Sequence, residues 1–251
     1  MSDAPLSREA FRAELAAVGE RQYHDLHPFH RMLHGGELNH GQVQAWALNR
    51  YYYQITIPRK DLTLMSRIHD TELRRTWRHR VNDHDGRDGD GGIERWLLLT
   101  DGVGLDREYV QSLAGLLPAT RFAVDAYVGF VGSRPTLDAI ASSLTEMFAA
   151  AIHRERIAGF ERYYAFANDD TLSYFRQRLV EAPRDVDFGL NYVLENAHTR
   201  DEQRRCVRAL TFKTELLWTQ LDALYYSYVD PGFIPPGAFV PADREPTEYV
   251  R

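Results

Sequence analysis

Polar and charged side chains recur at helical spacing in four segments that are otherwise apolar. Residues four or seven positions apart lie on the same face of an α-helix, so the members of each set would point to one side. The sets are Arg50 with Gln54, Glu146 with His153, Tyr174 with Arg178, and Lys213 among Leu210, Leu217 and Trp218. Because unpaired burial of a polar group is costly, a Glu and a His on an apolar stripe need either partners or a function.

Each set taken alone also has an ordinary structural interpretation. Arg50 and Gln54 could pair on the surface, and Lys213 could extend its amine to water from an apolar stripe. Combined, the basic residues predict a cationic pocket inside a protein whose net charge is -6. The contributors would be Arg50, Lys60, Arg80, Arg156, Arg178 and Lys213, with His24, His84 and His153. Such a pocket favours a small anion that carries several carboxylates.

Two other segments match the Glu-x-x-His spacing that di-iron carboxylate bundles use. They are Glu37–His40 and Glu195–His198. Glu37–His40 falls at a predicted helix start, where capping and exposure to solvent are the simpler interpretation. With Glu146 and His153, these segments nevertheless leave an iron-dependent oxygenase as an alternative.

Other binding motifs are weaker. A haem protein with His24, His27 or His30 as axial ligand has no discriminating residue in its favour. The segment GVGLDR lacks the third glycine of a dinucleotide-binding fingerprint, and DHDGRDGDGG resembles a calcium loop in composition only. The sequence therefore predicts no metal site.

Length and composition favour one large domain. The 251 residues are 44% hydrophobic, which is enough for a sizeable core, and no Gly/Ser-rich or Pro-rich linker divides them. The acidic net charge disfavours nonspecific nucleic-acid binding. Residues 1–7 lack the blocks of a signal peptide and no apolar run has membrane-spanning length, so we expect a cytoplasmic protein. The single cysteine, Cys206, excludes an intrachain disulfide, and its helical context predicts a buried, inert thiol.

Helical periodicity and capping residues predict an all-α chain. The expected helices are 8–23, 39–58, 61–84 as one or two helices, 93–100, 106–116, 118–132, 135–157, 170–182, 183–194 and 199–228. Asn39 and Thr199 would open capping boxes, and Pro58 would end or kink its helix. We expect one catalytic domain over residues 1–236, followed by a Pro-rich tail or linker at 237–251.

Six segments together resemble the pyrroloquinoline quinone synthase family, a TENA-like group. They occur in the family's order between about Phe11 and Pro236: RQYHDLHPFH, YYYQITIPRKD, NDHDG, LTEMFAAAIHRERI, YFRQRL and LTFKTELLW. The resemblance implies a haem-oxygenase-like bundle of about seven helices that encloses its site, and a homodimer. It also implies ring closure and eight-electron oxidation of a polycarboxylated amino precursor by O₂, which releases H₂O₂, with no metal or organic cofactor.

The same resemblance implies roles for particular residues. The ligand would be held by Tyr23, His24, Arg50, Gln54, Lys60, Arg80, Arg156 and Lys213. The oxygen site would comprise His84, His153, Tyr174 and Arg178, with Tyr127 and Glu146 nearby. A histidine could act as general base because its pKa lies near working pH, and Arg178 with a protonated histidine could stabilise reduced oxygen. A carrier that binds the quinone without making it is a further alternative.

Overall fold

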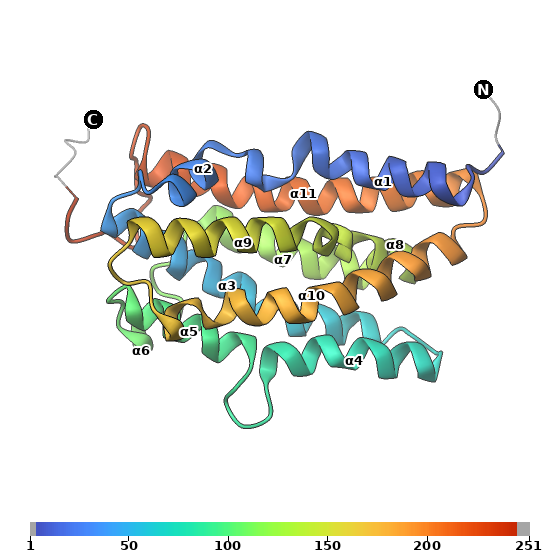
Figure 1. Ribbon diagram of the computed structural model, residues 1–251, viewed down its shortest axis with the longest axis horizontal. Helices are drawn as coiled ribbons and strands as arrows, with labels where there is room; N and C mark the ends of the chain where they lie inside the picture. The colour runs from blue at the N-terminus through green and yellow to red at the C-terminus, as the bar shows by residue number, and fades with distance from the viewer. Residues whose placement is uncertain (1–3, 245–251) are drawn as a thin grey trace.

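The computed structural model describes residues 4–244, apart from the side chains of residues 182, 183 and 185 (Figure 1). Within that range the chain forms helices α1 (Arg8–Gln22), η1 (His24–Leu26), α2 (Pro28–Gly35), α3 (His40–Met65), α4 (Thr71–Asp85), α5 (Gly92–Gly102), α6 (Arg107–Ser112), α7 (Pro118–Ser133), α8 (Thr136–Ala141), η2 (Ser142–Thr145), α9 (Glu146–Tyr163), α10 (Asp169–Asn196) and α11 (Arg200–Tyr228). The all-α prediction is confirmed. The helix count exceeds seven because short helices such as α2, α6 and α8 join the longer ones. None of the helices in the described range is long and apolar enough to span a bilayer.

Three of the predicted helix starts are confirmed by their caps. The side chains of Ser7, Asn39 and Thr199 accept hydrogen bonds from backbone N–H groups of α1, α3 and α11, and the last two form complete capping boxes. The start of α10 differs from the prediction, because Asn168 rather than Asp170 is the cap.

Both prolines that were expected to interrupt helices lie within continuous ones. Helix α3 continues through Pro58 to Met65, and α10 continues through Pro183 to Asn196. A proline removes one backbone hydrogen bond, but α3 is buried along most of its length, including Trp46, Ile57 and Leu64. Packing on neighbouring helices therefore outweighs the local preference.

The single helix predicted over 135–157 is instead three pieces. Residues 142–145 form the 3₁₀ turn η2 between α8 and α9, and the Ser142 hydroxyl donates to the Ala139 carbonyl oxygen at 2.6 Å. Serine side chains that bond nearby backbone groups compete with α-helix, which explains the break. Helix α2 was not predicted at all.

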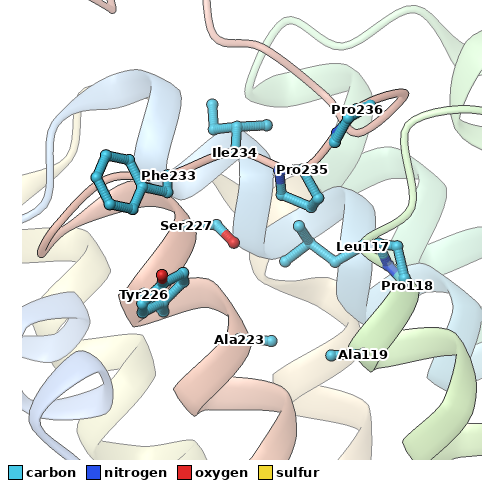
Figure 2. A pocket seen from close by; sticks show the side chains of 10 residues that line it. All are labelled: Leu117, Pro118, Ala119, Ala223, Tyr226, Ser227, Phe233, Ile234, Pro235 and Pro236. Atoms are coloured by element: carbon cyan, nitrogen blue, oxygen red, sulfur yellow. The ribbon is translucent and has the colours of Figure 1, made fainter. Parts of the chain in front are cut away.

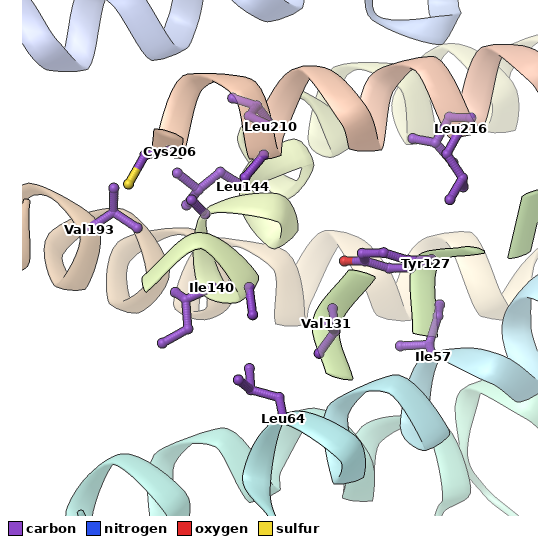
Figure 3. Packing of buried hydrophobic residues seen from close by; sticks show 14 of the residues in the cluster. Ile57, Leu64, Tyr127, Val131, Ile140, Leu144, Val193, Cys206, Leu210 and Leu216 are labelled. Carbon is purple, nitrogen blue, oxygen red and sulfur yellow. The ribbon is translucent and has the colours of Figure 1, made fainter. Parts of the chain in front are cut away.

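The core consists of two buried clusters. Figure 3 shows part of one, filled by side chains of α3, α7, α8, η2, α10 and α11, including Leu64, Val131, Leu144 and Cys206. Cys206 is buried, as predicted. The other cluster is built around Trp46, and it includes several further aromatic side chains. Helix α10 packs along α9 and α5, and α11 along α1 and α7, so polar residues on α9, α10 and α11 are drawn inside (Figure 1).

The segment after α11 packs back onto the bundle. Phe239 N–H donates to the Gly115 carbonyl at 2.9 Å, and Gly41 N–H donates to Asp243 Oδ2 at 3.0 Å. Residues 237–244 of the predicted tail are thus held against α3 and the α6–α7 loop. The rest of that tail, 245–251, lies outside the described residues.

Candidate active site

A buried cavity of about 50 Å³ lies among η1, α3, α4, α5, η2, α9, α10 and α11. Ten of the predicted site residues line it: Tyr23, His24, Arg50, Gln54, His84, Glu146, His153, Arg156, Tyr174 and Arg178. The other four do not line it but lie beside it: Lys60, Arg80, Tyr127 and Lys213. This volume is below that of a typical small-molecule site, so the lining side chains must move apart to admit a ligand.

Glu146 joins two of the arginines at one end of the cavity. Its carboxylate accepts from Arg178 Nη2 at 2.7 Å and lies 3.4 Å from Arg80 Nη2. Arg178 also donates to Glu181 at 3.0 Å. Burial alone would raise the pKa of Glu146, but the two arginines hold it below its usual value. Glu146 is therefore an anion that compensates these cations.

Lys60 and Arg80 share a second carboxylate behind the cavity wall. Lys60 Nζ donates to Asp61 and to Ser143 Oγ, the latter at 3.2 Å, and Arg80 Nε lies 3.7 Å from Asp61. Trp77 Nε1 donates to Asp61 at 2.7 Å. Lys60 is thus a buried partner of Asp61, one layer behind the residues that line the cavity.

Lys213 lies against two tyrosine rings. Its Nζ donates to the Tyr53 hydroxyl at 2.7 Å and is 3.7 Å from the centre of the Tyr127 ring. Burial, followed by the charges of Arg50 and Lys60, lowers the pKa of Lys213 well below its usual value. A bound anion would reverse part of this shift, because it would favour the charged amine.

The histidines that line the cavity are held in a neutral state. Burial and then Arg178 lower the pKa of His84 to about 4, and burial with nearby arginines lowers the pKa values of His24 and His153 well below 6.5. The expectation of a protonated histidine beside reduced oxygen is therefore not supported in the unliganded protein. The physical reason is that the rings are buried, in a cavity that is already cationic.

One histidine has a defined orientation. His84 Nδ1 lies 2.9 Å from the Arg80 carbonyl oxygen, which requires Nδ1 to carry the proton. His84 Nε2 is buried and has no hydrogen-bond partner among the described residues. Its lone pair is available to a ligand.

Tyr174 is positioned by contacts on two sides. Its hydroxyl donates to Gln54 Oε1 at 2.9 Å, and its ring meets Trp96 edge-on at 5.0 Å. Burial raises the pKa of Tyr174. The phenol is therefore a protonated donor, and its ring centre is 6.3 Å from that of His153.

The residues of the alternative iron and haem sites do not come together in this cavity. Glu37, His40, Glu195 and His198 are all exposed on the surface. Nor do any three His, Cys, Asp or Glu side chains within residues 4–244 gather into a set able to hold a metal ion. His27 and His30 are engaged elsewhere, since His27 Nε2 lies 3.0 Å from Asp222 and His30 Nδ1 lies 3.1 Å from the His24 carbonyl oxygen.

Sequence reasoning missed several residues of the cavity wall. Tyr53 and Leu217 lie on the same faces as Arg50 and Lys213, so helical spacing could have found them. Trp96 and Thr145 come from separate elements and carry no such signal. Asp61, which pairs with Lys60, was also overlooked.

Comparison with known proteins shows the family of the chain. The model of the TENA/THI-4/PQQC family matches residues 12–223. A protein of Rhizobium rhizogenes named pyrroloquinoline-quinone synthase is 61% identical over 93% of this chain and 95% of its own length. One of the same name from Granulibacter bethesdensis is 60% identical over 94% and 93%. The chain belongs to the TENA/THI-4/PQQC family. The resemblance to pyrroloquinoline quinone synthases is confirmed.

Solved structures agree on the fold of this TENA/THI-4/PQQC member. A domain from Shewanella denitrificans with a haem-oxygenase-like fold superposes with a TM-score of 0.70 at 13% identity, covering 92% of this chain and 96% of that one. A TenA homologue from P. horikoshii gives 0.69 at 12% identity, covering 88% and 99%. The predicted haem-oxygenase-like fold is confirmed.

Proposed function

We propose that this protein carries out the last step of pyrroloquinoline quinone biosynthesis without a metal or organic cofactor. It closes a ring in a polycarboxylated amino precursor and removes eight electrons with O₂, releasing H₂O₂. The observation that carries the proposal is the enclosed, cation-lined cavity in a chain about 60% identical to proteins of that name. A quinol-like substrate can give electrons to O₂ directly, so the protein's task is to hold it, move protons and stabilise reduced oxygen.

Substrate carboxylates are held by cations that have no carboxylate partner within the described residues. Arg50 and Arg156 line the cavity and Lys213 lies just behind it, whereas Arg80 and Lys60 are paired with Glu146 and Asp61. Tyr23, His24, Gln54 and Tyr127 complete the binding set. Several fixed contacts to one substrate would fold it toward its own amine, which lowers the entropic barrier to ring closure.

Oxygen is reduced near Arg178 and Tyr174. The Arg178 guanidinium favours superoxide or peroxide over neutral O₂, and the Tyr174 hydroxyl can donate a hydrogen bond or relay a proton. His84 Nε2 or His153 removes protons from the substrate, because both rings are neutral and can accept them. The fixed tautomer of His84 favours it as the base.

The test is O₂ consumption by purified protein freed of metal and supplied with the precursor. We expect quinone and H₂O₂ to form at an unchanged rate in the presence of chelator. A requirement for added iron would support the iron-dependent oxygenase instead, and metal analysis of the purified protein would agree. Binding of the quinone without any turnover of the precursor would support a carrier.

The remaining expectations concern the whole chain. We propose a single catalytic domain over residues 1–236 and a cytoplasmic homodimer that binds no nucleic acid. Light scattering of the purified protein tests the dimer directly.

A further inference from the structure

A second, smaller chamber of about 10 Å³, with room for one very small molecule, lies behind the candidate active site. His24, Arg50 and Arg156 line both spaces, so these three side chains lie between them. Thr120 and Leu224 lie on the chamber's other side. None of the roles proposed above uses this space.

Three buried polar atoms of the chamber's lining residues lack a hydrogen-bond partner among the described residues. They are His24 Nδ1, Thr120 Oγ1 and Arg156 Nε, on side chains of residues at most 6% exposed. Leaving such groups unsatisfied is costly, and native proteins satisfy them with protein groups, ordered water or a bound ligand. The three atoms offer both donors and acceptors. The chamber is thus suited to a small molecule that both donates and accepts hydrogen bonds.

On its outer side the chamber approaches the protein surface. A groove of about 620 Å³ is lined by Ala119 and Ala223, the chain neighbours of Thr120 and Leu224. Figure 2 shows Leu117, Pro118 and Ala119 facing Ala223, with Ile234, Pro235 and Pro236 across the groove. Thr120 and Leu224 therefore form a thin wall between the chamber and this groove.

The proposed reaction needs a second way out of the cavity. Removal of eight electrons consumes at least two O₂ molecules, since each accepts at most four electrons, and four if each is reduced only to H₂O₂. Each H₂O₂ takes two electrons and two protons originating from the substrate. Small oxygen species must therefore enter and leave while the organic intermediate still occupies the enclosed site.

We infer that the chamber is a transit site through which hydrogen peroxide leaves toward the groove while the intermediate stays bound. The inference rests on the proposed function. Arg156 Nε–H can donate to a peroxide oxygen, and a peroxide O–H can donate to Thr120 Oγ1 or to His24 Nδ1. O₂ gains little from such groups because it is a poor hydrogen-bond acceptor. The polar lining thus favours the reduced product over the gas.

The first test narrows the chamber with Leu224→Phe, and Leu216→Phe on the same helix is the matched control. Leu216 is similarly buried but lines neither space. In single turnovers, we expect Leu224→Phe to leave the first loss of substrate absorbance unchanged and to slow quinone formation and H₂O₂ release by about tenfold. Product affinity should stay within about twofold, because the cavity that holds the organic ligand is untouched.

A second pair of variants tests the hydrogen bonds that the Thr120 hydroxyl would form, rather than the volume of the chamber. Thr120→Val keeps the shape but removes the hydroxyl, so it should slow peroxide release, and Thr120→Ser should restore it. Crystals of the wild-type protein soaked in hydrogen peroxide should show elongated density beside Thr120 and Arg156, and Thr120→Val crystals should not. A single spherical water in the soaked wild-type crystals would count against the transit site.

The results of these experiments distinguish a failure of the transit site from a failure of the proposed oxidase activity. If the wild-type protein turns over the precursor but Leu224→Phe and Leu216→Phe behave alike at every step, the transit site is wrong and the oxidase stands. The transit site is equally wrong if Leu224→Phe weakens product binding in proportion to the rate. If the wild-type protein consumes no O₂ with the precursor, the oxidase itself is wrong.

Discussion

Glu146 divides the cations of the cavity into two groups. Arg178 and Arg80 already contact this carboxylate, whereas within residues 4–244 no carboxylate pairs with Arg50 or Arg156. A carboxylate ligand therefore gains most from Arg50 and Arg156, since it need not displace an internal anion. Arg178, already compensated, is better placed to respond to charge that develops during the reaction.

Replacing Arg178 separates catalysis from binding. We expect Arg178→Ser to lower the rate of oxidation by about 10²-fold or more, because it removes a preorganised charge that acts mainly in the transition state. Product affinity should fall much less. Stopped-flow oxidation and equilibrium titration of the product measure the two effects. Equal losses in both would make Arg178 a simple carboxylate clamp, and Arg176→Ser, on the exposed face of α10, is the control.

The low pKa of His84 predicts how kcat/KM depends on pH. With a pKa of about 4 in the free enzyme, its Nε2 is already deprotonated near neutrality. We therefore expect kcat/KM to show no His84 inflection between about pH 5 and about pH 8, whereas an ordinary histidine would give one near 6.5. His84→Asn should reduce kcat by about 10²-fold or more at every pH in that range. A loss below twofold would assign the base to His153.

Helix α10 is the element that sets the oxygen side of the site. It carries Tyr174 and Arg178 on one face and begins at a capping box, in which Thr171 N–H donates to Asn168 Oδ1 at 3.0 Å. Its length depends on packing along α9 and α5. The cap and the catalytic face are about one and a half turns apart, so their contributions can be measured separately.

Removing that cap should affect stability more than rate. We expect Asn168→Ala to lower the free energy of unfolding by about 1 kcal/mol, because the first turn of α10 loses a satisfied donor. Asn168→Asp keeps an acceptor at the cap and should be close to wild type. Urea denaturation checks the first effect, and kcat/KM should stay within about twofold. A tenfold loss of kcat/KM in Asn168→Ala would show that the cap positions Tyr174.

Local sequence signals predicted the helices that depend on local chemistry. The capping boxes at Asn39 and Thr199 were found because their partners are three residues away. Pro58 was misjudged, because burial on several sides decides that region and spacing along the chain does not record it. The break at 142–145 depends on the Ser142 hydroxyl, which donates to a backbone carbonyl oxygen instead of to solvent.

The residues that line the cavity were predicted more completely than the helix boundaries, and their roles stay predictions. Polar residues at helical spacing, such as Arg50 with Gln54, lie on the faces that enclose the cavity. Their long-range partners could not be found this way. The contact of Tyr174 with Gln54, for example, joins residues 120 positions apart and follows only from the bundle's topology.

Across the whole molecule, buried neutral histidines make the fold sensitive to acid. Burial lowers the pKa values of His24, His30, His84 and His153, and that of His34 to about 3. In the unfolded chain these histidines take up protons near pH 6.5, whereas in the folded protein they do not. Their contribution to the free energy of unfolding is therefore fully present above pH 6.5, and it is lost as the pH falls toward the folded-state pKa values.

The free energy of unfolding should therefore fall steeply between about pH 7 and about pH 5, by up to about 1.4 kcal/mol per pH unit for each such histidine. Urea denaturation at several pH values measures the slope. His84→Asn should make it shallower, whereas His79→Asn, on the exposed face of α4, should leave it unchanged. An equal free energy of unfolding at about pH 5 and about pH 7 would contradict the conclusion that these histidines are buried and neutral.

The isolation of Cys206 has a consequence for an enzyme that generates an oxidant. Oxidative damage to cysteine begins at the thiolate, and burial followed by the charge of Asp138 raises the pKa of Cys206 to about 12. Because it is the only cysteine in the sequence, the chain presents no readily oxidised thiol to the peroxide that leaves its own active site. After many successive turnovers Cys206 should therefore still be a free thiol.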